Sequence, residues 1–341
     1  MPPRMLNRRT ALGIGSVAAA GAALGAGQGV ALADSTPPVP SAATPDGARR
    51  LIAEVYRAQT ARAGGTWNSF ITVADPDGTL VPAVEDNPDE IVQAYSVNKI
   101  AVSTAVLDKI DRGLLTLDQR VELTAAIVIA DGDGTYWIDS AYPSSLTLGH
   151  VMATLLTISD DTCVRLCGLV CPALELNQIL VAKGFPRTQV IPVANPNRFY
   201  LGLTTPRETH DMLQALVRGT LLSATGTEFL LTALRAPVAF TDGIRRTMSS
   251  DERARIATKA GWDADGRNEA GIMFDTTGRP VLTYSMFAHG QADPDNFGAT
   301  HPAVQARAVM GRRFLDAIDR LYGPVTVKPM PSRRYRPSNG G

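Results

Sequence analysis

Two side chains near the end of the first third of the chain could carry out nucleophilic chemistry together. Ser96 and Lys99 form the only Ser-x-x-Lys of the sequence, and an apolar run that begins at Ile100 follows them. A spacing of three places both side chains on one helix face, where the amine can take the proton of an otherwise weak hydroxyl nucleophile. Backbone N–H groups at a helix start can also stabilise an oxyanion. A solvated serine and lysine on a surface helix is the alternative, and the apolar run argues against it.

Two further signals strengthen this pattern. Ser159-Asp160-Asp161 begins 63 residues after Ser96, and Lys259-Ala260-Gly261 begins 163 residues after it. Only five of the 33 basic residues are lysines, and Lys99 and Lys259 are two of them. A lysine at these places therefore stands out from a background of arginine.

The order and spacing of these signals resemble a known family. Ser-x-x-Lys, then Ser-Asp-Asn, then Lys-Thr-Gly is the signature of class A β-lactamases and penicillin-binding proteins. Thr204-Thr205-Pro206, which opens a helix after a long loop, is similar to that family as well. The resemblance extends roughly from Asp46 to Gly323.

The resemblance implies a role for each catalytic residue. Ser96 would be the acylated nucleophile, and Lys99 its base or relay. Ser159 would pass a proton to the leaving nitrogen. Lys259 would steady Ser159 and attract a substrate carboxylate.

The same resemblance implies the substrate-binding residues. The N–H groups of Ser96 and Trp262 would form the oxyanion hole, at the end of a strand segment that contains Ala260 and Gly261. Tyr136-Trp137 lies where the family keeps an aromatic ring at the mouth of the cleft, although a packed loop anchor explains this pair equally well.

Asp161 is the first departure from the family pattern. The family has Asn here, which can donate to a substrate carbonyl, whereas an ionised Asp only accepts. A carboxylate also favours the charged form of a neighbouring amine, which opposes the use of Lys99 as a base. Asp161 therefore indicates either a Lys99–Asp161 proton pair or a substrate that presents an amine.

Ala260 is the second departure, since the family has a hydroxyl residue at this position. The loss removes one hydrogen bond to a bound carboxylate, worth about 1 to 3 kcal/mol. Arg245 or Arg246, before the strand, could compensate.

The third departure is a missing carboxylate. The family keeps a Glu in the long loop before Thr-Thr-Pro, where it activates the deacylating water. From residue 162 to residue 207 the only carboxylate is Glu175, which lies on a predicted helix before that loop. The loop itself, about residues 184–203, offers Asn195 and Asn197, and an amide cannot act as a general base. We therefore expect acylation by penicillins to be faster than deacylation.

The pattern of elements predicts an α+β fold. Strand-forming segments occur early, at 67–74 and 79–84, and again late, at 254–258, 269–274 and 281–288. Helical periodicity occurs between them and at both ends. These helical segments are 46–63, 96–112, 147–158, 162–169, 172–183, 206–218, 224–234 and 303–321. We expect an antiparallel sheet formed by the N- and C-terminal segments and flanked by helices, with an all-helical lobe, as in β-lactamases and transpeptidases.

The N-terminal 33 residues predict an export signal. Asn7-Arg8-Arg9-Thr10-Ala11-Leu12 is a twin-arginine pattern, and an apolar stretch rich in Gly and Ala ends at Ala31-Leu32-Ala33. The stretch is short and weakly apolar for a membrane span, so no stable membrane anchor is expected. Residues 34–45 read as a disordered spacer, 46–325 as the hydrolase domain and 326–341 as a flexible tail. We expect a secreted or cell-envelope protein.

The remaining composition limits the possible partners. The formal net charge is zero, so the sequence does not indicate nucleic acid as a partner. Cys163, Cys167 and Cys171 are spaced by four residues on one predicted helix, which favours a buried face of small side chains over a disulfide or a metal site. No metal and no organic cofactor is expected, and the resemblance implies a monomer.

Together these features predict an exported serine hydrolase of the class A β-lactamase type, which acts on a β-lactam or a related peptide-like amide. One alternative is a D-alanyl-D-alanine peptidase or esterase, and the missing Glu favours it modestly. Another is a protein that binds β-lactams without hydrolysing them.

Overall fold

The computed structural model describes residues 44–237 and 243–322, which all belong to one compact unit, Val39–Gly341. The expected export signal (1–33), nearly all of the expected spacer (34–45) and the expected tail (326–341) lie outside the described residues.

The described chain alternates short strands with helices. The helices are α1 (Pro45–Ala63), the 3-10 helix η1 (Tyr95–Asn98), α2 (Lys99–Asp111), α3 (Leu148–Thr157), α4 (Asp161–Val170), α5 (Ala173–Ala182), α6 (Pro206–Val217), α7 (Ala224–Leu234), α8 (Ser250–Arg253) and α9 (Pro302–Tyr322). The strands are β1 (Thr66–Ala74), β2 (Leu80–Asp86), β3 (Val92–Gln93), β4 (Arg120–Leu123), β5 (Ser144–Thr147), β6 (Gln189–Pro192), β7 (Phe199–Thr204), β8 (Ile256–Asp263), β9 (Gly266–Phe274) and β10 (Pro280–His289).

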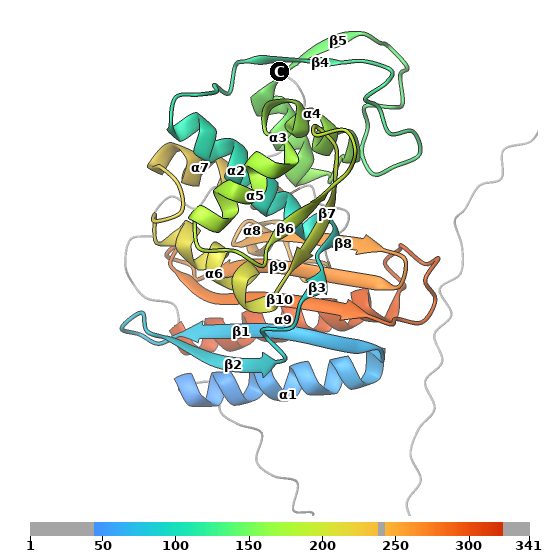
Figure 1. The fold of residues 1–341 in the computed structure, drawn as a ribbon. Coiled ribbons are helices and arrows are strands. Elements are labelled where there is room, and N and C mark those ends of the chain that lie inside the picture. Colours follow the sequence, from blue (N-terminus) through green and yellow to red (C-terminus); the bar gives the residue numbers. More distant parts are fainter. Residues whose placement is uncertain (1–43, 238–242, 323–341) are drawn as a thin grey trace, which may run out of the picture. The chain divides into compact units, whose positions relative to one another are not determined.

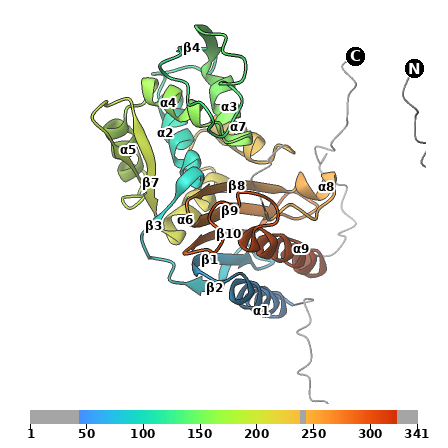
Figure 2. The same ribbon diagram turned by 90° about the vertical axis from the view of Figure 1, so that its right-hand side faces the viewer.

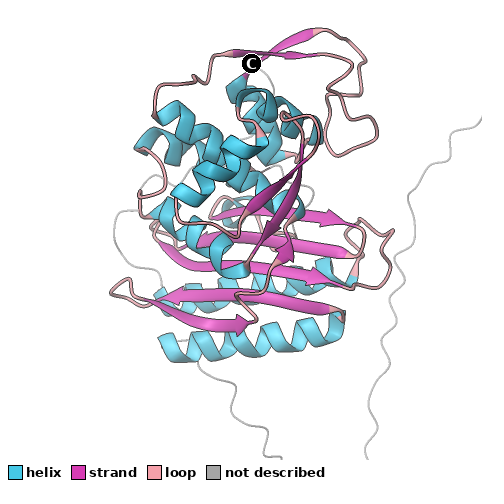
Figure 3. Ribbon diagram, in the orientation of Figure 1, coloured by secondary structure: helices cyan, strands magenta, loops and turns pink. Residues whose placement is uncertain are grey.

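A five-stranded antiparallel sheet in the order β2-β1-β10-β9-β8 joins the two ends of the chain (Figure 1 and, by type of element, Figure 3). Phe70 of β1 pairs with Ser285 of β10, and Lys259 of β8 pairs with Ala270 of β9. β8 is an edge strand, so one of its sides is free of strand neighbours among the described residues. The antiparallel sheet expected from the sequence is confirmed.

Helices α1 and α9 cover one face of this sheet, as Figure 2 shows. Alternate residues of β1 (Trp67, Ile71 and Val73) pack in one apolar cluster with α9 residues such as Phe314 and Ile318. Alternate side chains of a strand point to the same face, and an apolar stripe on the helix packs against them, while the other β1 residues are buried on the opposite face.

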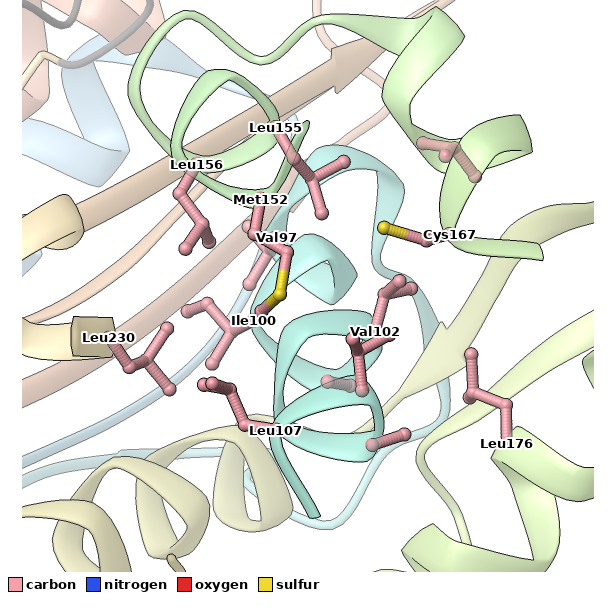
Figure 4. Close-up of a cluster of buried hydrophobic side chains, with 14 of the residues drawn as sticks. Val97, Ile100, Val102, Leu107, Met152, Leu155, Leu156, Cys167, Leu176 and Leu230 are labelled. Atoms are coloured by element: carbon pink, nitrogen blue, oxygen red, sulfur yellow. The ribbon is translucent and has the colours of Figure 1, made fainter. Parts of the chain in front are cut away.

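The opposite face carries a lobe built mainly of helices, with α2 at its centre. Ten of the 13 residues of α2 are buried, because α3, α4, α5 and α7 surround it. Figure 4 shows Ile100, Val102 and Leu107 of α2 among Leu155 of α3 and Leu230 of α7. A helix that is buried on all sides needs apolar residues on all sides, which explains the apolar density of its sequence. The expected helical lobe is confirmed, and it also carries two short sheets, β3-β7-β6 and β4-β5, which the all-helical prediction did not include.

Three local features differ from the sequence prediction. Ser96 lies in the 3-10 turn η1, and the α-helix begins only at Lys99. β8 continues to Asp263, five residues beyond the predicted strand end, because β9 supplies partners through Gly266. The loop expected at 184–203 contains most of the β6–β7 hairpin, whose strands the sequence analysis did not predict.

In the described part of the chain, no single helix is long and apolar enough to cross a membrane. Only α4 and α5 taken together, at an angle of 82°, reach that length and composition.

Candidate active site

Ser96 is held against the edge strand β8. A Cβ atom on Gly261 would lie 2.6 Å from the Ser96 nitrogen and 2.7 Å from the Val97 nitrogen, so only glycine allows η1 to approach β8 this closely. On the other side, the Asn98 side-chain amide donates to the backbone oxygens of Leu201 (2.6 Å) and Leu203 (3.0 Å) on β7. The nucleophile candidate is therefore fixed between two strands.

The two lysines of the sequence signals meet on one hydroxyl group. Lys99 Nζ and Lys259 Nζ each lie 3.0 Å from Ser159 Oγ. Lys99 also donates to the Ser159 backbone oxygen, and Lys259 donates to the Ala260 oxygen at 2.6 Å. All three side chains are almost completely buried. Ser159 has a φ of 62°, a left-handed conformation that is unfavourable for serine and typical of functional turns.

Asp161 completes an ion pair with Lys99 and anchors the facing loop. Its Oδ1 lies 2.7 Å from Lys99 Nζ, as the proton-pair hypothesis requires. Its Oδ2 accepts from the Asp133 backbone N–H at 3.2 Å, and its own N–H donates to the Asp133 oxygen at 2.9 Å. The loop that contains Asp133 is therefore tied directly to the lysine cluster.

The Asp160 side chain holds the start of α4 and the facing loop together. Its fully buried carboxylate caps α4 by accepting from the N–H groups of Thr162 and Cys163. It also accepts from the N–H groups of Thr135 and Tyr136. Four backbone donors on two segments therefore depend on one side chain.

Burial and like charges perturb two ionisable groups at the site. Burial, together with the nearby Lys99 charge, lowers the pKa of Lys259 to about 7. Burial, together with the nearby Asp161 carboxylate, raises the pKa of Asp133. An amine with a pKa near neutrality can both accept and return a proton, which is what acid–base catalysis requires.

A cavity of about 810 Å³ opens above this cluster. Ser96, Asp161 and Trp262 line it, whereas Ser159 and the two lysines are buried beneath its floor. The other lining residues are Gln93, Tyr95, Ile129, Asp131, Gly132, Asp133, Val164, Arg165, Val193, Arg198, Phe199, Tyr200, Leu201, Gly202, Asp263 and Phe297. A buried nucleophile–amine cluster at the base of a substrate-sized cavity can carry out acyl transfer.

Comparison with known proteins agrees with this geometry. Residues 49–318 match the model of the Beta-lactamase enzyme family. The chain belongs to this family.

Solved β-lactamase structures share the fold. The β-lactamase from Sphaerobacter thermophilus is 23% identical with a TM-score of 0.64, and the match covers 78% of this chain and 96% of that chain. The β-lactamase from Chitinophaga pinensis is 20% identical with a TM-score of 0.66, covering 80% and 99%. A point mutant of PBP-A, solved as an acyl-enzyme complex with penicillin G, is 21% identical with a TM-score of 0.60, covering 78% and 96%. A search of curated proteins gave no match.

In this member of the Beta-lactamase enzyme family, the structure brings together Lys99, Ser159, Asp161 and Lys259. The Ser96 backbone nitrogen lies against Gly261, and Ser96 lines the cavity with Asp161 and Trp262. Ala260 is buried in β8 next to Lys259 and pairs with Glu269 of β9.

Of the six sequence-predicted binding residues, only Trp262 lines the cavity, and Tyr136, Trp137 and Arg245 are engaged elsewhere. Tyr136 hydrogen-bonds Thr154 at 3.1 Å, and Trp137 donates to the Gly132 oxygen at 3.2 Å, so both anchor their own loop. Arg245 is fully buried and donates to the backbone oxygen of Ala236 at 2.9 Å. The structure therefore does not place Arg245 where it could replace the hydroxyl group lost at Ala260.

Sequence reasoning missed the cavity aromatics Tyr95, Tyr200 and Phe297, and the loop carboxylate Asp133. Tyr95 precedes the nucleophile and has a φ of 49°. Asp133 belongs to the Asp131-Gly132-Asp133-Gly134 segment, whose glycines are typical of a turn. The sequence hints at the role of Asp133 only through its position between the Ser-x-x-Lys and Ser-Asp-Asp signals.

The three cysteines are free thiols buried around α4. Within residues 44–237 and 243–322, no group of three or more His, Cys, Asp or Glu side chains could hold a metal ion.

Proposed function

We propose that this chain is an exported serine hydrolase that is acylated at Ser96 by a β-lactam or a related amide. One observation carries the proposal: Lys99 and Lys259 converge on Ser159 Oγ, directly beneath a cavity that Ser96 lines. The family membership supports the same chemistry. The twin-arginine pattern and the small-residue stretch after it support export.

Acylation follows from the buried network. Ser96 Oγ attacks the carbonyl carbon, and its proton passes to the amine cluster formed by Lys99 and Lys259. Ser159, which both amines contact, returns a proton to the leaving nitrogen as the carbon–nitrogen bond breaks. The N–H of Ser96 and that of Trp262 at the end of β8 stabilise the oxyanion. Neutral Lys259, available because its pKa lies near 7, lowers the cost of accepting this proton.

Deacylation is slow in this proposal, because the wall formed by the β6–β7 hairpin presents no carboxylate among the described residues. Its cavity-lining residues are Val193, Arg198, Phe199, Tyr200, Leu201 and Gly202. Glu175 pairs with Lys109 at 2.7 Å, outside the cavity. The Glu208 carboxylate accepts from the N–H of Arg187 at 3.0 Å, also outside it. A water molecule on this side of the acyl group therefore meets no general base.

Intact-mass spectrometry after mixing with benzylpenicillin tests the proposal. We expect a one-to-one adduct that lasts much longer than the turnover time of an ordinary β-lactamase. Ser96→Ala should form no adduct. Ser144→Ala, on β5 outside the cavity, is the matched control and should be acylated like the wild type. An unmodified wild-type protein would contradict acylation. Rapid release of penicilloate without a lasting adduct would contradict the missing-base argument.

The missing carboxylate also favours a second candidate function, a D-alanyl-D-alanine peptidase or esterase. The solved PBP-A relative carries penicillin G as an acyl-enzyme. Release of D-alanine from an N-acylated D-Ala-D-Ala peptide would support this function. A chromogenic cephalosporin separates the remaining cases, since steady turnover indicates a lactamase and a single stoichiometric burst indicates a protein that only traps the ligand.

Export is tested independently of catalysis. We expect replacement of Arg8 and Arg9 by lysine to move the protein from the extracytoplasmic to the cytoplasmic fraction of an expressing bacterium. An unchanged distribution would contradict the twin-arginine route.

A further inference from the structure

Two arginines line the cavity from different segments of the chain. Arg165 lies on α4, four residues after Asp161 and therefore on the same face of the helix, about 6 Å farther along its axis. Arg198 lies directly before β7. We call Arg165 and Arg198 the arginine pair.

Packing between the two segments brings the guanidinium groups of the arginine pair together. A Cβ atom on Gly168 would lie 2.2 Å from the Asn197 oxygen, so only glycine lets α4 and the loop before β7 approach this closely. Arg165 Nη1 donates to two backbone oxygens at 3.0 and 3.1 Å, and Arg198 Nη2 donates to the preceding one at 2.9 Å, all within residues 126–128. Burial, followed by the Arg198 charge, lowers the pKa of Arg165, as expected of neighbouring cations. Three consecutive backbone oxygens therefore hold the two groups next to each other.

Both guanidinium groups keep donors for a ligand. Each nitrogen of a guanidinium group carries N–H donors. In the part of the chain that the structure describes, Nε and Nη2 of Arg165 and Nε and Nη1 of Arg198 have no hydrogen-bond partner, and neither arginine forms an ion pair. Two adjacent cations at a cavity wall attract an anion, and the planar guanidinium fork matches the geometry of a carboxylate.

Four carboxylates line the same cavity, those of Asp131, Asp133, Asp161 and Asp263. Asp161 already pairs with Lys99 at 2.7 Å. Asp131 and Asp263 are exposed, so solvent and salt screen their charges. Burial, together with the Asp161 charge, raises the pKa of Asp133 and favours its neutral form. These carboxylates weaken the attraction of the arginine pair for an anion, but none of them occupies its free N–H groups.

We propose that the arginine pair binds a carboxylate carried by the acyl group that becomes attached to Ser96. Ser159, which protonates the leaving nitrogen in the proposed reaction, precedes α4, and Arg165 lies along α4 in the direction away from Ser159. The leaving group therefore departs at the Ser159 end of the cavity, and the acyl group extends toward the arginine pair. The inference rests on the proposed acylation of Ser96 and names the substrate class of the same site.

Three penicillins that differ only at the end of a flexible side chain test the inference. A pentanoyl side chain is neutral, a glutaryl side chain ends in a carboxylate, and an ω-aminopentanoyl side chain ends in an ammonium group. Second-order acylation rates are measured by intact mass at about pH 7, where both end groups are charged. We expect the glutaryl compound to acylate the wild type about tenfold faster than the pentanoyl compound. The ω-aminopentanoyl compound should be no faster than the pentanoyl compound.

The substituted proteins are compared through the glutaryl-to-pentanoyl rate ratio, so that a general loss of activity does not matter. Arg165→Gln and Arg198→Gln should each reduce the ratio by about threefold or more, because each removes one charge from the arginine pair. Arg198→Lys keeps the charge and should keep a higher ratio than Arg198→Gln. If Arg165→Gln fails to fold, the two Arg198 variants decide the question.

Arg120→Gln is the matched control. Arg120 is exposed, lies outside the cavity and also donates to a backbone oxygen, that of Ser145, at 2.8 Å. Its substitution removes an arginine charge and a backbone contact without changing the arginine pair. This variant should keep the wild-type ratio.

The outcomes separate the two proposals. Equal acylation of the wild type by the glutaryl and pentanoyl compounds overturns the carboxylate site and leaves the proposed function intact. A preference for the ω-aminopentanoyl compound does the same, and so does a glutaryl preference that survives both Arg→Gln substitutions. Absence of acylation by all three compounds overturns the proposed function, and the inference fails with it.

Discussion

Lys99 Nζ and Lys259 Nζ donate to the same oxygen atom, Ser159 Oγ, at 3.0 Å each. One hydroxyl oxygen can accept two hydrogen bonds, so the contact saturates it and leaves its own proton free for transfer. Two buried amines this close repel each other when both are charged. Transfer of a proton from these amines through Ser159 to the substrate therefore reduces the repulsion between Lys99 and Lys259.

Lys259→Met should change how stability depends on pH. In the unfolded chain this lysine titrates near 10.5, and in the folded protein near 7, so between these values the unfolded state binds more protons. Wild-type stability thus gains as pH rises through this window, and a methionine cannot contribute that gain. We expect the free energy of unfolding of the wild type, minus that of Lys259→Met, to increase by about 1 to 3 kcal/mol from pH 6.5 to pH 9.5. Urea denaturation at each pH measures both values.

The control for this experiment is Lys183→Met, which removes a lysine whose ion pair with Asp108 lies outside the cluster. An equally large pH-dependent shift in the control, or none in Lys259→Met, would show that the cluster does not lower the pKa of Lys259.

Asp161→Asn should increase the rate of acylation by benzylpenicillin. The change removes the carboxylate paired with Lys99 Nζ at 2.7 Å and supplies an amide that can donate to a substrate carbonyl. We expect a gain of about tenfold at pH 7, since one charge-assisted contact is worth on the order of 1.5 kcal/mol. Rates come from intact-mass time courses, with Asp118→Asn as an exposed charge-removal control. A fall in rate would instead make Asp161 a participant in proton transfer.

The main elements of the fold were predictable because their signals are local. Strand-forming residues mark β1, and an amphipathic pattern marks α9, so the sheet and its helical cover follow from local sequence. The three signals with Ser96, Ser159 and Lys259 identified the residues at the centre of the candidate site, because family resemblance carries long-range information that periodicity lacks.

The positions of the other site residues depend on packing between segments that are distant in the sequence. The sequence suggests that Arg245 is available to a substrate, but it is fully buried, and the backbone oxygens of Ala236 and Ile256 accept its N–H groups. Asp133 stands in a glycine-rich segment typical of a turn, and its backbone hydrogen bonds with Asp161 place it at the cavity. Such positions are set by tertiary structure and leave no mark in local patterns.

Asp160→Ala should strongly destabilise the protein, although its carboxylate caps backbone groups rather than binding the lysines. Four backbone N–H groups, on α4 and on the loop 134–136, would lose their buried acceptor. A Cβ atom on Gly134 would lie 2.1 Å from this carboxylate, so the loop is built around it. We expect a loss of about 3 kcal/mol in the free energy of unfolding, measured by urea denaturation.

Ser249→Ala provides the comparison for this substitution, because it removes an exposed helix cap on α8 and should cost only about 1 kcal/mol. Asp160→Asn keeps one acceptor oxygen and should lie between the two. Equal effects of Asp160→Ala and Ser249→Ala would mean that Asp160 only caps its own helix.

Cys163, Cys167 and Cys171 should be unreactive in the folded protein. Each has no exposed surface, and burial raises the pKa of all three, that of Cys171 to about 12. The thiolate is the reactive form, and at neutral pH buried thiols of this kind do not supply it. We expect Ellman's reagent to label fewer than about one thiol per native chain in an hour and all three in guanidinium chloride. Rapid labelling of the native protein that Zn²⁺ suppresses would instead favour the metal-site alternative for this cysteine stripe, because a thiolate bound to metal is protected without being buried.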